Sequence, residues 1–376
     1  MTTLYRCLLT ACLASCASLA FAAEAPLNHI SVFVSGQDGY HTFRIPAVEV
    51  APDGSLLIVA EARKYTSEDP GYGDQEIDLV YKRSTDQGAT WSPMVVMEHA
   101  GTFWASANPA TVVDRSNGKI WVFYVRAKPH RSSDTARPGT DDMRNLARWS
   151  ADNGKTWSEP VDLTPVARDM KDPAWKVSVP GPGGVIQTRS GRIILAMWRM
   201  PFSCFALFSD DHGATWHRGQ LVPGTQGGDE CKVVELADGR ILFNMRQETG
   251  PTSYLAESAD GGMTWTNLRP GPKVSPVACG FKYLAMGDHG HVLWTGPESS
   301  KRKHLAFRCS DDEGKTFKYR RLISDDFAAY SDIALLPGHT VGVVWERGLK
   351  KNYELISFTR LDRAWLDAVS PANSGP

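Results

Sequence analysis

The stretch "SADNGKTW", residues 150–157, follows a frame that recurs along the chain: S-x-D-x-G-x-T followed by Trp or Phe. Further copies begin at Ser84, Ser209, Ser258 and Ser310. In such a frame the aspartate accepts hydrogen bonds from nearby backbone N–H groups, the glycine adopts positive φ without steric cost, and the aromatic ring packs over the turn. Each copy therefore predicts a turn that closes a β-hairpin. A catalytic or metal-binding role for the aspartates is disfavoured, because one turn repeated around a fold cannot serve one site.

Glycine turns ahead of apolar strands mark a second repeat. The glycines are Gly54, Gly118, Gly191, Gly239, Gly290 and Gly338. The first five are each followed by a copy of the frame, and the sixth is followed by "YELISFTRLD". Repeats spaced by about 50 to 65 residues are typical of propellers and arrays. The chain is therefore predicted to be all-β, a six-bladed β-propeller with four short strands per blade. We expect "ISVFVSG" near the start to pair into the last blade and close the ring, which removes open sheet edges.

The first 23 residues are expected to be a signal peptide that is removed. Arg6 supplies the charge, "CLLTACLASCASLAF" is the apolar run, and residues 20–22 offer small side chains for cleavage. An alternative is "LASC", which resembles a bacterial lipoprotein box that would anchor the protein at Cys16. Either reading predicts an exported protein, periplasmic or secreted. Residues 24–368 are expected to form one β-propeller domain, and residues 369–376 a loose tail.

The composition excludes several classes of partner. The formal net charge is −1 over 376 residues, which gives no sign of a nucleic-acid partner. The N-terminal apolar run is too short to span a bilayer stably, so no membrane span is expected. The cysteines outside the signal show no metal-binding spacing, and we expect them to be buried. They are Cys204, Cys231, Cys279 and Cys309. We expect a monomer without a metal or cofactor.

Charged residues recur where strands of several blades end or begin. Arg44 lies in the apolar stretch "YHTFRIPAVEV", where burying a charge is costly unless it is paired. Arg246 follows an apolar strand pattern in "NMRQ", Arg302 precedes a strand, and Glu346 lies in "VVWERG". Because propeller strands run radially toward one axis, these side chains are predicted to converge at one mouth of the ring.

The combination of "FRIP", residues 43–46, with five copies of the frame resembles the exo-sialidase (neuraminidase) family, in which the frame is known as the Asp box or BNR repeat. The resemblance covers essentially the whole chain after the signal. It implies that Arg44, Arg246 and Arg302 bind the carboxylate of sialic acid, and that Glu346 braces the first of them. Arginine suits this task because its planar guanidinium donates two parallel hydrogen bonds to a carboxylate.

The resemblance also implies a tyrosine nucleophile and its base. Sialidases use tyrosine where other glycosidases use a carboxylate. A carboxylate attacking a carbon that bears another would meet a repulsion of about 4 kcal/mol at about 4 Å. "FAAYSDIALLPG" puts Tyr330 just before an expected strand, and "GGDECKVVEL" contains Glu230, the matching base. A tyrosine is a weak nucleophile without such a base.

The acid/base residue is less well determined. Asp69 and Asp74 lie in "EARKYTSEDPGYGDQEIDLVYKRS", and spacing from Arg63 favours Asp69 whereas spacing back from Ile77 falls nearer Asp74. Asp69 is the predicted acid/base, and Asp74 is the alternative. Arg63 resembles a family arginine that contacts the sugar ring. Trp104 is a candidate wall for the pocket that takes the N-acetyl group, although a core position is an equal alternative.

The resemblance therefore implies an exo-α-sialidase that acts on sialylated glycans of glycoproteins, glycolipids and oligosaccharides, with retention, through a sialyl–tyrosine intermediate. Two alternatives stay open. One is another enzyme on the same scaffold: a trans-sialidase, an intramolecular trans-sialidase or a hydrolase for a related sugar acid such as Kdn. The other is a propeller lectin that binds sialic acid without cleaving it.

Overall fold

The computed structural model describes residues 26–225, 227–286 and 289–371, so the predicted signal peptide lies outside the described part. The regular secondary structure of the described residues is almost entirely β-strand. Its two helices are short, α1 (Thr164–Ala167) and α2 (Arg363–Asp367). No described helix is long and apolar enough to cross a membrane. The all-β prediction is confirmed.

The strands pair into two sheets of four and two sheets of eight. We divide each larger sheet into two units of four antiparallel strands, and all such units are called blades below. Blade 1 consists of β2 (Thr42–Val50), β3 (Leu56–Arg63), β4 (Ile77–Ser84) and β5 (Val95–Glu98). Blade 2 consists of β6 (Ala105–Asp114), β7 (Lys119–Ala127), β8 (Met143–Ser150) and β9 (Val161–Asp162). Blade 3 consists of β10 (Val177–Gln187), β11 (Ile193–Met200), β12 (Ser203–Ser209) and β13 (His217–Arg218).

Blade 4 consists of β14 (Gly228–Glu235), β15 (Ile241–Gln247), β16 (Thr252–Ser258) and β17 (Thr266–Lys273). Blade 5 consists of β18 (Gly280–Met286), β19 (His289–Ser299), β20 (Lys303–Ser310) and the first half of β21 (Tyr319–Leu336). Blade 6 consists of the second half of β21, β22 (Thr340–Gly348), β23 (Leu355–Leu361) and β1 (His29–Val34). The long β21 thus serves two blades.

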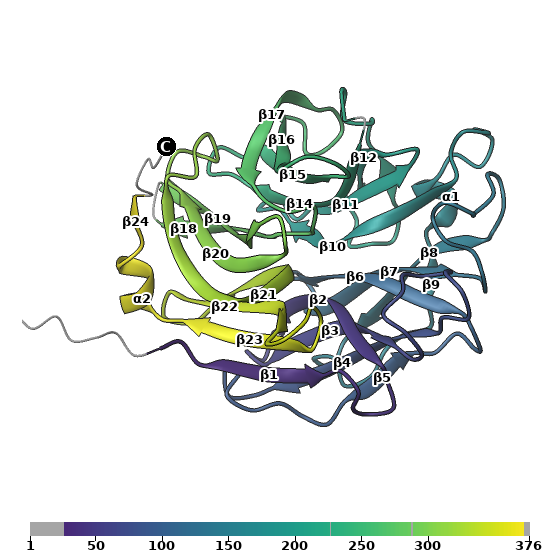
Figure 1. Ribbon diagram of the computed structural model, residues 1–376. Helices are drawn as coiled ribbons and strands as arrows, with labels where there is room; N and C mark the ends of the chain where they lie inside the picture. Colours follow the sequence, from purple (N-terminus) through teal and green to yellow (C-terminus); the bar gives the residue numbers. More distant parts are fainter. Residues whose placement is uncertain (1–25, 226, 287–288, 372–376) are drawn as a thin grey trace, which may run out of the picture.

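The first strands of successive blades contact one another in a closed order: β2, β6, β10, β14, β18, β21 and back to β2. Figure 1 shows the same order, with the colours of the chain running once around the molecule. As predicted, β1 completes the last blade by pairing with β23, so an N-terminal and a C-terminal strand of the described chain close the ring. Side chains on these inner strands are thereby gathered around one axis.

The repeated frame forms the predicted turn between the third and fourth strands of blades 1 to 5. In blade 2, Asp152 accepts hydrogen bonds from the N–H and the hydroxyl of Thr156 at 2.9 and 2.7 Å. Gly154 has a φ of 76°, and its N–H is bound by the hydroxyl of Ser150 at 2.8 Å. These bonds are local, so the aspartates serve the turn.

In blades 1 and 3 the aromatic residue that closes the frame packs against a neighbouring blade. Trp91 of blade 1 packs edge-on against Phe358 of blade 6, with ring centroids 5.5 Å apart. Trp216 of blade 3 packs in the same way against Phe123 of blade 2, at 5.3 Å. Aromatic pairs in this geometry contribute beyond the area they bury. The frame therefore stabilises the contact between blades as well as the hairpin.

Some details depart from the sequence-based expectations. Gly290 lies inside β19, where a Cβ would meet the ring of Tyr283 at 2.2 Å, so this glycine permits a close approach instead of opening the strand from a turn. Two residues of the expected loose tail form β24 (Ser370–Pro371), which pairs with β21. Residues 372–376 lie outside the described part.

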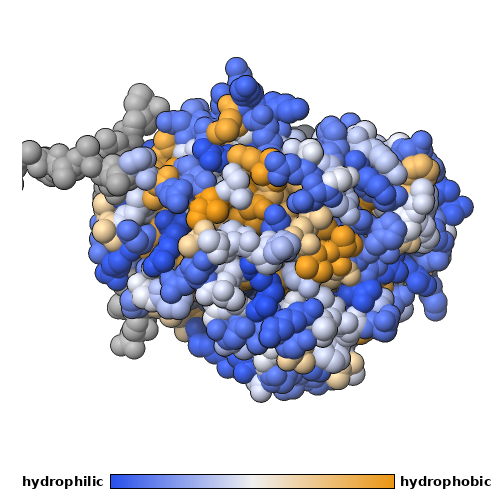
Figure 2. Space-filling model, turned by 90° about the horizontal axis from the view of Figure 1, so that it is seen from below, coloured by the Kyte–Doolittle hydropathy of each residue, from blue (hydrophilic) through white to orange (hydrophobic). Residues whose placement is uncertain are grey.

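The described cysteines are all free; Cys204, Cys231 and Cys279 are buried and Cys309 is partly buried. The expectation of buried cysteines therefore holds for three of them. The face of the molecule seen in Figure 2 is mostly hydrophilic, with hydrophobic patches toward its middle.

Candidate active site

A β-bulge interrupts most inner strands at a corresponding point. A bulge bends the strand and re-aims its side chains, and bulges are enriched next to active sites. The register shifts between Arg44 and Ala47 in β2, between Gly228 and Cys231 in β14, and between Ala328 and Ser331 in β21. Arg44, Glu230 and Tyr330 therefore lie at the edge of such a bulge or within it. The inner strands use these irregularities to present polar side chains near the axis.

Arg44 is buried and paired. Its Nε and Nη2 donate to the two carboxylate oxygens of Glu346 at 2.9 and 3.2 Å, and the residues are 5% and 1% exposed. Glu346 also accepts the backbone N–H groups of Ile45 at 2.9 Å and of Tyr330 at 3.2 Å. Ile45 has a φ of 54°, an unfavourable value for a β-branched residue, so this bond stabilises a strained bulge. One carboxylate thus holds Arg44 and the backbone of Tyr330 together.

Arg246, at the end of β15, connects Glu230 and Tyr330. Its Nη1 donates to Oε2 of Glu230 at 2.7 Å and to Oη of Tyr330 at 2.9 Å. Both acceptor residues are 6% exposed. Because the two oxygens share one donor, the structure brings the phenol and the carboxylate next to each other.

The other two arginines also lie around Tyr330. The Cζ of Arg44 is 5.1 Å and that of Arg302 is 6.0 Å from the centroid of its ring. Burial raises the pKa of Tyr330 well above its ordinary value; Arg246 opposes this shift, Glu230 adds to it, and Arg44 and Arg302 also oppose it. The three arginines therefore favour the phenolate, against a burial that disfavours it.

Asp69 lies on the loop between β3 and β4, beside the same arginines. Its Oδ1 accepts a hydrogen bond from Nη1 of Arg63 at 2.8 Å and lies 3.7 Å from Nη1 of Arg44. Arg63 is held in turn by the buried Glu61, which accepts from its Nε and Nη2 at 2.9 and 2.6 Å. Burial alone would raise the pKa of Asp69, but Arg63 and Arg44 outweigh it and hold the pKa below its ordinary value.

Asp74 does not join this group. Its carboxylate is 73% exposed and lies 3.7 Å from Nε2 of His130. It lines a separate surface pocket with residues that include Tyr65 and Phe103. Of the two aspartates that the sequence left open, only Asp69 is beside the arginines.

A cavity of about 250 Å³ opens at this cluster. Its polar wall contains Asp69, Arg63, Glu230, Arg246 and Tyr330. Its apolar wall includes Val125, Met143, Val179, Trp198 and Phe202. Trp104 is not among the residues that line the cavity, so its predicted role as a pocket wall finds no support. It is partly buried just before β6, and its backbone N–H bonds the carbonyl of Gly101 at 3.1 Å.

The structure adds residues that sequence reasoning missed. Tyr353, in the turn between β22 and β23, stacks on Arg44, whose Cζ is 3.9 Å from its ring centroid, and its hydroxyl is bound by Arg302. Asp229 is 4% exposed, and its carboxylate lies 3.2 Å from Nη1 of Arg246. Asp229 could have been noticed as the neighbour of Glu230. Nothing local distinguishes Tyr353 from an ordinary turn residue.

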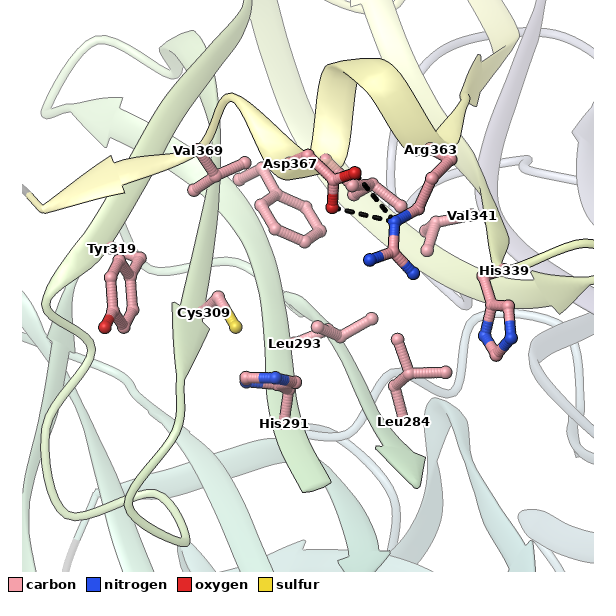
Figure 3. Close-up of a pocket in the computed structure, with 12 residues that line it drawn as sticks. Leu284, His291, Leu293, Cys309, Tyr319, His339, Val341, Arg363, Asp367 and Val369 are labelled. Carbon is pink, nitrogen blue, oxygen red and sulfur yellow. Dashed lines mark hydrogen bonds and ion pairs between the residues drawn. The ribbon is translucent and has the colours of Figure 1, made fainter. Parts of the chain in front are cut away.

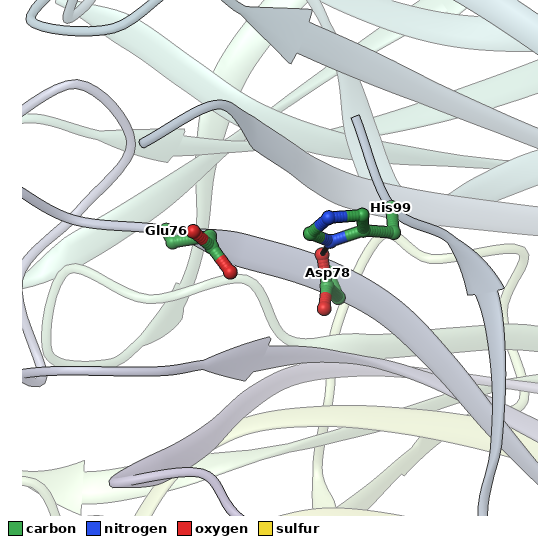
Figure 4. A group of neighbouring side chains, drawn as sticks. All are labelled: Glu76, Asp78 and His99. Carbon is green, nitrogen blue, oxygen red and sulfur yellow. Dashed lines mark hydrogen bonds and ion pairs between the residues drawn. The ribbon is translucent and has the colours of Figure 1, made fainter. Parts of the chain in front are cut away.

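A second cluster of ionisable groups lies in blade 1 and just beyond it. Glu76, Asp78 and His99 bring potential metal-ligand atoms within 4.8 Å of one another (Figure 4). However, Glu76 accepts from Nζ of Lys64 at 2.6 Å, and Asp78 accepts from the hydroxyl of Tyr40 at 2.6 Å and bonds Nδ1 of His99 at 2.9 Å. A hydrogen-bond network that is already complete explains these three residues.

An apolar pocket of about 190 Å³ lies beside α2, between blades 5 and 6 (Figure 3). Its lining includes Leu284, Leu293 and Val341, and its charged residues Arg363 and Asp367 bond each other at 2.7 and 2.9 Å. The arginine in its lining is thus paired with Asp367, whereas three arginines surround Tyr330. The cluster around Tyr330 is therefore the better candidate for catalysis.

Comparison with known proteins identifies the family of the chain. The BNR repeat-like domain family matches residues 52–343. A sialidase of Micromonospora viridifaciens is 31% identical over 89% of this chain, which spans only 54% of that relative. An exo-alpha-sialidase of Aspergillus fumigatus is 27% identical over 87% of this chain and 86% of its own length.

Among solved structures, the Hadza microbial sialidase Hz136 superimposes with a TM-score of 0.81 at 25% identity. The match covers 91% of this chain and 69% of that one. The likeness therefore extends over nearly the whole described fold.

Proposed function

The chain belongs to the sialidase family with BNR repeat-like domains, and from this premise we propose that it is a retaining exo-α-sialidase. It would release terminal sialic acid from glycoconjugates by hydrolysis. One observation carries the proposal: three arginines from different blades surround a single buried phenol, and Arg246 donates to this phenol and to the buried Glu230. A carbohydrate with a carboxylate on its reactive carbon fits this arrangement.

Arg44, Arg246 and Arg302 would bind the substrate carboxylate. Bidentate hydrogen bonds from guanidinium groups fix the orientation of a carboxylate as well as its position. Since the arginines lie around the Tyr330 ring, a carboxylate bound there puts the anomeric carbon next to the phenol. The apolar wall of the cavity, which includes Trp198 and Met143, would take the N-acetyl methyl group.

Tyr330 would be the nucleophile. In the first step its Oη forms a bond to the anomeric carbon, the bond from that carbon to the leaving oxygen breaks, and Glu230 takes the phenolic proton. Arg246, which donates to both groups, stabilises the negative charge that develops on the phenol oxygen. In the second step water attacks the anomeric carbon, and Tyr330 leaves and recovers its proton from Glu230.

Asp69 would protonate the leaving oxygen and later accept the proton of the attacking water. In this structure Arg63 and Arg44 favour its charged form. A substrate carboxylate that binds Arg44 neutralises part of this positive field, so we infer that substrate binding raises the pKa of Asp69 and prepares it as the acid. The exposed position of Asp69, on a loop above the cavity, gives it access to the leaving group.

The first test is hydrolysis of a fluorogenic sialoside by the wild type and by Tyr330→Phe. We expect the wild type to release the fluorophore and the variant to lose activity by about 10³-fold or more. Tyr319→Phe is the matched control, because this tyrosine lies on the same strand but bonds Asp311 at the surface. A wild type that binds sialic acid and releases no fluorophore would instead be a lectin.

The second test traps the intermediate. A fluorinated sialyl donor slows the second step, so mass spectrometry of the digested protein should find the sugar on the peptide that contains Tyr330. A label on any other residue would overturn the assignment of the nucleophile. Analysis of the products with lactose present distinguishes transfer from hydrolysis. We also propose that the enzyme acts outside the cytoplasm, as the apolar N-terminal run indicates.

A further inference from the structure

The loop that carries Asp69, residues 64–76, is closed at its base by a buried amide. Gln75 is 1% exposed, and its Nε2 donates to the carbonyl oxygens of Thr66 and Glu68, both at 3.0 Å. Its Oε1 accepts the N–H of Glu76 at 3.2 Å. The two arms of the loop are therefore tied together where they leave the sheet.

The tip of this loop rests directly on a second loop, residues 128–142, which connects β7 and β8 of blade 2. The contact is made by Gly71, which is buried and has a φ of 78°. A Cβ at this position would lie 2.2 Å from the carbonyl carbon and oxygen of Arg131 and 2.4 Å from the nitrogen of Ser132. Because these are backbone atoms, no side-chain rotation can relieve the overlap.

Hydrogen bonds join the same two loops on the C-terminal side of Gly71. The hydroxyl of Tyr72 donates to a carboxylate oxygen of Asp134. Nδ1 of His130 donates to the carbonyl oxygen of Gly73 at 3.0 Å. The contact between the loops is thus a fitted one, with backbone packing at its centre and polar contacts beside it.

This contact is connected to the Asp69 carboxyl through a short stretch of chain. Asp69 precedes Gly71 by two residues, and its carbonyl oxygen accepts the N–H of Tyr72 at 3.2 Å. The side chain of Asp69 is 63% exposed, so its position depends on Arg63 and on the path of the loop. Tyr72 and Asp134 also line the cavity, which puts the loop contact at the rim of the site.

We propose that Gly71 is a positioning residue for the acid/base: its backbone contact with Arg131 seats the loop on blade 2 and aligns the Asp69 carboxyl with the leaving oxygen. This inference rests on the proposed function, because it takes Asp69 to be the general acid. It adds that a loop of blade 2 determines whether the acid of blade 1 is in place.

The experiment uses the leaving group as the readout. Proton donation matters most for a poor leaving group such as the sugar hydroxyl of sialyllactose, and little for an activated aryl sialoside. In Gly71→Ala we expect kcat/KM for sialyllactose to fall by about 100-fold, and that for the aryl sialoside by less than about tenfold. A general loss of fold would reduce both rates alike.

Gly73→Ala is the matched control. Gly73 lies in the same loop, has a positive φ of 56°, and has no atom within 4 Å of its Cβ position. Its substitution causes the same kind of backbone strain without the overlap. We expect kcat/KM for both substrates to change by the same factor and to stay within about threefold of the wild-type values. The quantity to compare is the ratio of kcat/KM for sialyllactose to kcat/KM for the aryl sialoside. If this ratio is the same in Gly71→Ala and in Gly73→Ala, the proposal is overturned.

Tyr72→Phe keeps the test decisive if Gly71→Ala does not fold. This substitution removes the hydrogen bond to Asp134 without changing the backbone. We therefore expect kcat/KM for sialyllactose to fall by about 3- to 10-fold, and kcat/KM for the aryl sialoside to stay unchanged. No difference between the substrates would count against it.

Asp69→Ala separates failure of this inference from failure of the proposed function. If Asp69→Ala does not discriminate between the substrates, Asp69 is not the acid, and the proposed roles of Asp69 and of Gly71 both fail. If the wild type does not hydrolyse sialosides, the proposed function itself fails. If Asp69→Ala discriminates and the variants at the loop contact do not, only the role of Gly71 fails.

Discussion

The Nζ of Lys232 lies 2.6 Å from a carboxylate oxygen of Asp332, and both residues are buried, at 2% and 4% exposure. Lys232 follows Glu230 by two residues on β14, and Asp332 follows Tyr330 by two residues on β21. The pair therefore links the strands that carry the proposed base and nucleophile, across two blades that are not neighbours. Asp332 also accepts the N–H of Val48 on β2 at 3.0 Å, so the pair is connected to a third inner strand.

Breaking this pair should destabilise the protein strongly. Lys232→Met leaves the Asp332 carboxylate buried without its partner, which we expect to cost about 3–5 kcal/mol in the free energy of unfolding. Lys232→Met combined with Asp332→Leu removes both charges and should recover most of this loss. Urea unfolding of the variants measures the difference. A single variant as stable as the wild type would show that the pair contributes nothing.

Arg246→Lys should reduce activity with little effect on the fold. A lysine keeps the charge but has one nitrogen, which cannot hold Glu230, Tyr330 and a substrate carboxylate together. We expect kcat/KM to fall by about 100- to 1000-fold while the melting temperature changes by only a few degrees. Arg240→Lys is the control, because Arg240 lies at the opposite end of the same blade and pairs with Asp238 and Glu257. Near-normal turnover in Arg246→Lys would exclude the proposed clamp.

Asp152→Ala should have the opposite profile, because Asp152 stabilises a turn remote from the arginines. Loss of its hydrogen bonds to Thr156 should cost about 1–3 kcal/mol of stability, and the folded variant should keep its specific activity. The hydroxyl and N–H of Thr156 lower the pKa of Asp152 below its ordinary value of 3.8.

The stabilisation from Asp152 is therefore present above about pH 4 and is lost as the pH falls below that value. Thermal unfolding of the wild type and of Asp152→Ala should therefore show a smaller difference in stability at pH 3 than at pH 7. An inactive but fully stable Asp152→Ala would mean that the chemistry lies elsewhere.

Asp229 should make the KM for the substrate depend on pH near neutrality. Burial raises the pKa of Asp229 to about 7, with Arg246 opposing the shift and Glu230 adding to it. As the pH rises through 7, the new carboxylate, 3.2 Å from Arg246, competes with the substrate carboxylate. We expect the KM of the wild type to rise several-fold between pH 6 and pH 8, and that of Asp229→Asn to stay nearly constant.

The raised pKa of Asp229 should also make the folded protein less stable as the pH rises. The folded state retains a proton that the unfolded state releases near pH 4, so this contribution to stability is present below pH 4 and is lost as the pH rises to about 7. Asp229→Asn should therefore gain stability relative to the wild type at pH 8 compared with pH 5. A constant difference across this range would contradict the shifted pKa.

The blades were predictable because the frame acts locally. The Ser, Asp, Gly and Thr of one copy bond each other within seven residues, so their spacing alone identifies the turn. The expectation that Gly290 lies in a turn was wrong, because a glycine that permits close packing looks the same in sequence as one that opens a turn. Trp104 illustrates a similar ambiguity, since a tryptophan in a pocket wall and one beside a strand carry no different local signal.

The choice between Asp69 and Asp74 could not be made from spacing. The two residues lie five positions apart on one loop, and the loop path decides which one faces the arginines. That path depends on the buried amide of Gln75 and on the contact of Gly71 with Arg131 in another blade. Neither contact is visible in a local pattern, because its partner is distant or is backbone.

The sequence by itself determined the all-β class, the hairpin turns and the kinds of residue available for the site, since these follow from short-range bonding and side-chain chemistry. Only the tertiary structure decided which of those residues meet. Arg44 and Glu346 are 302 positions apart, and Arg246 and Tyr330 are 84 apart, yet each pair forms hydrogen bonds. The physical reason is ring closure: the first strands of all blades surround one axis, and bulges in those strands turn side chains from remote parts of the chain toward a common point.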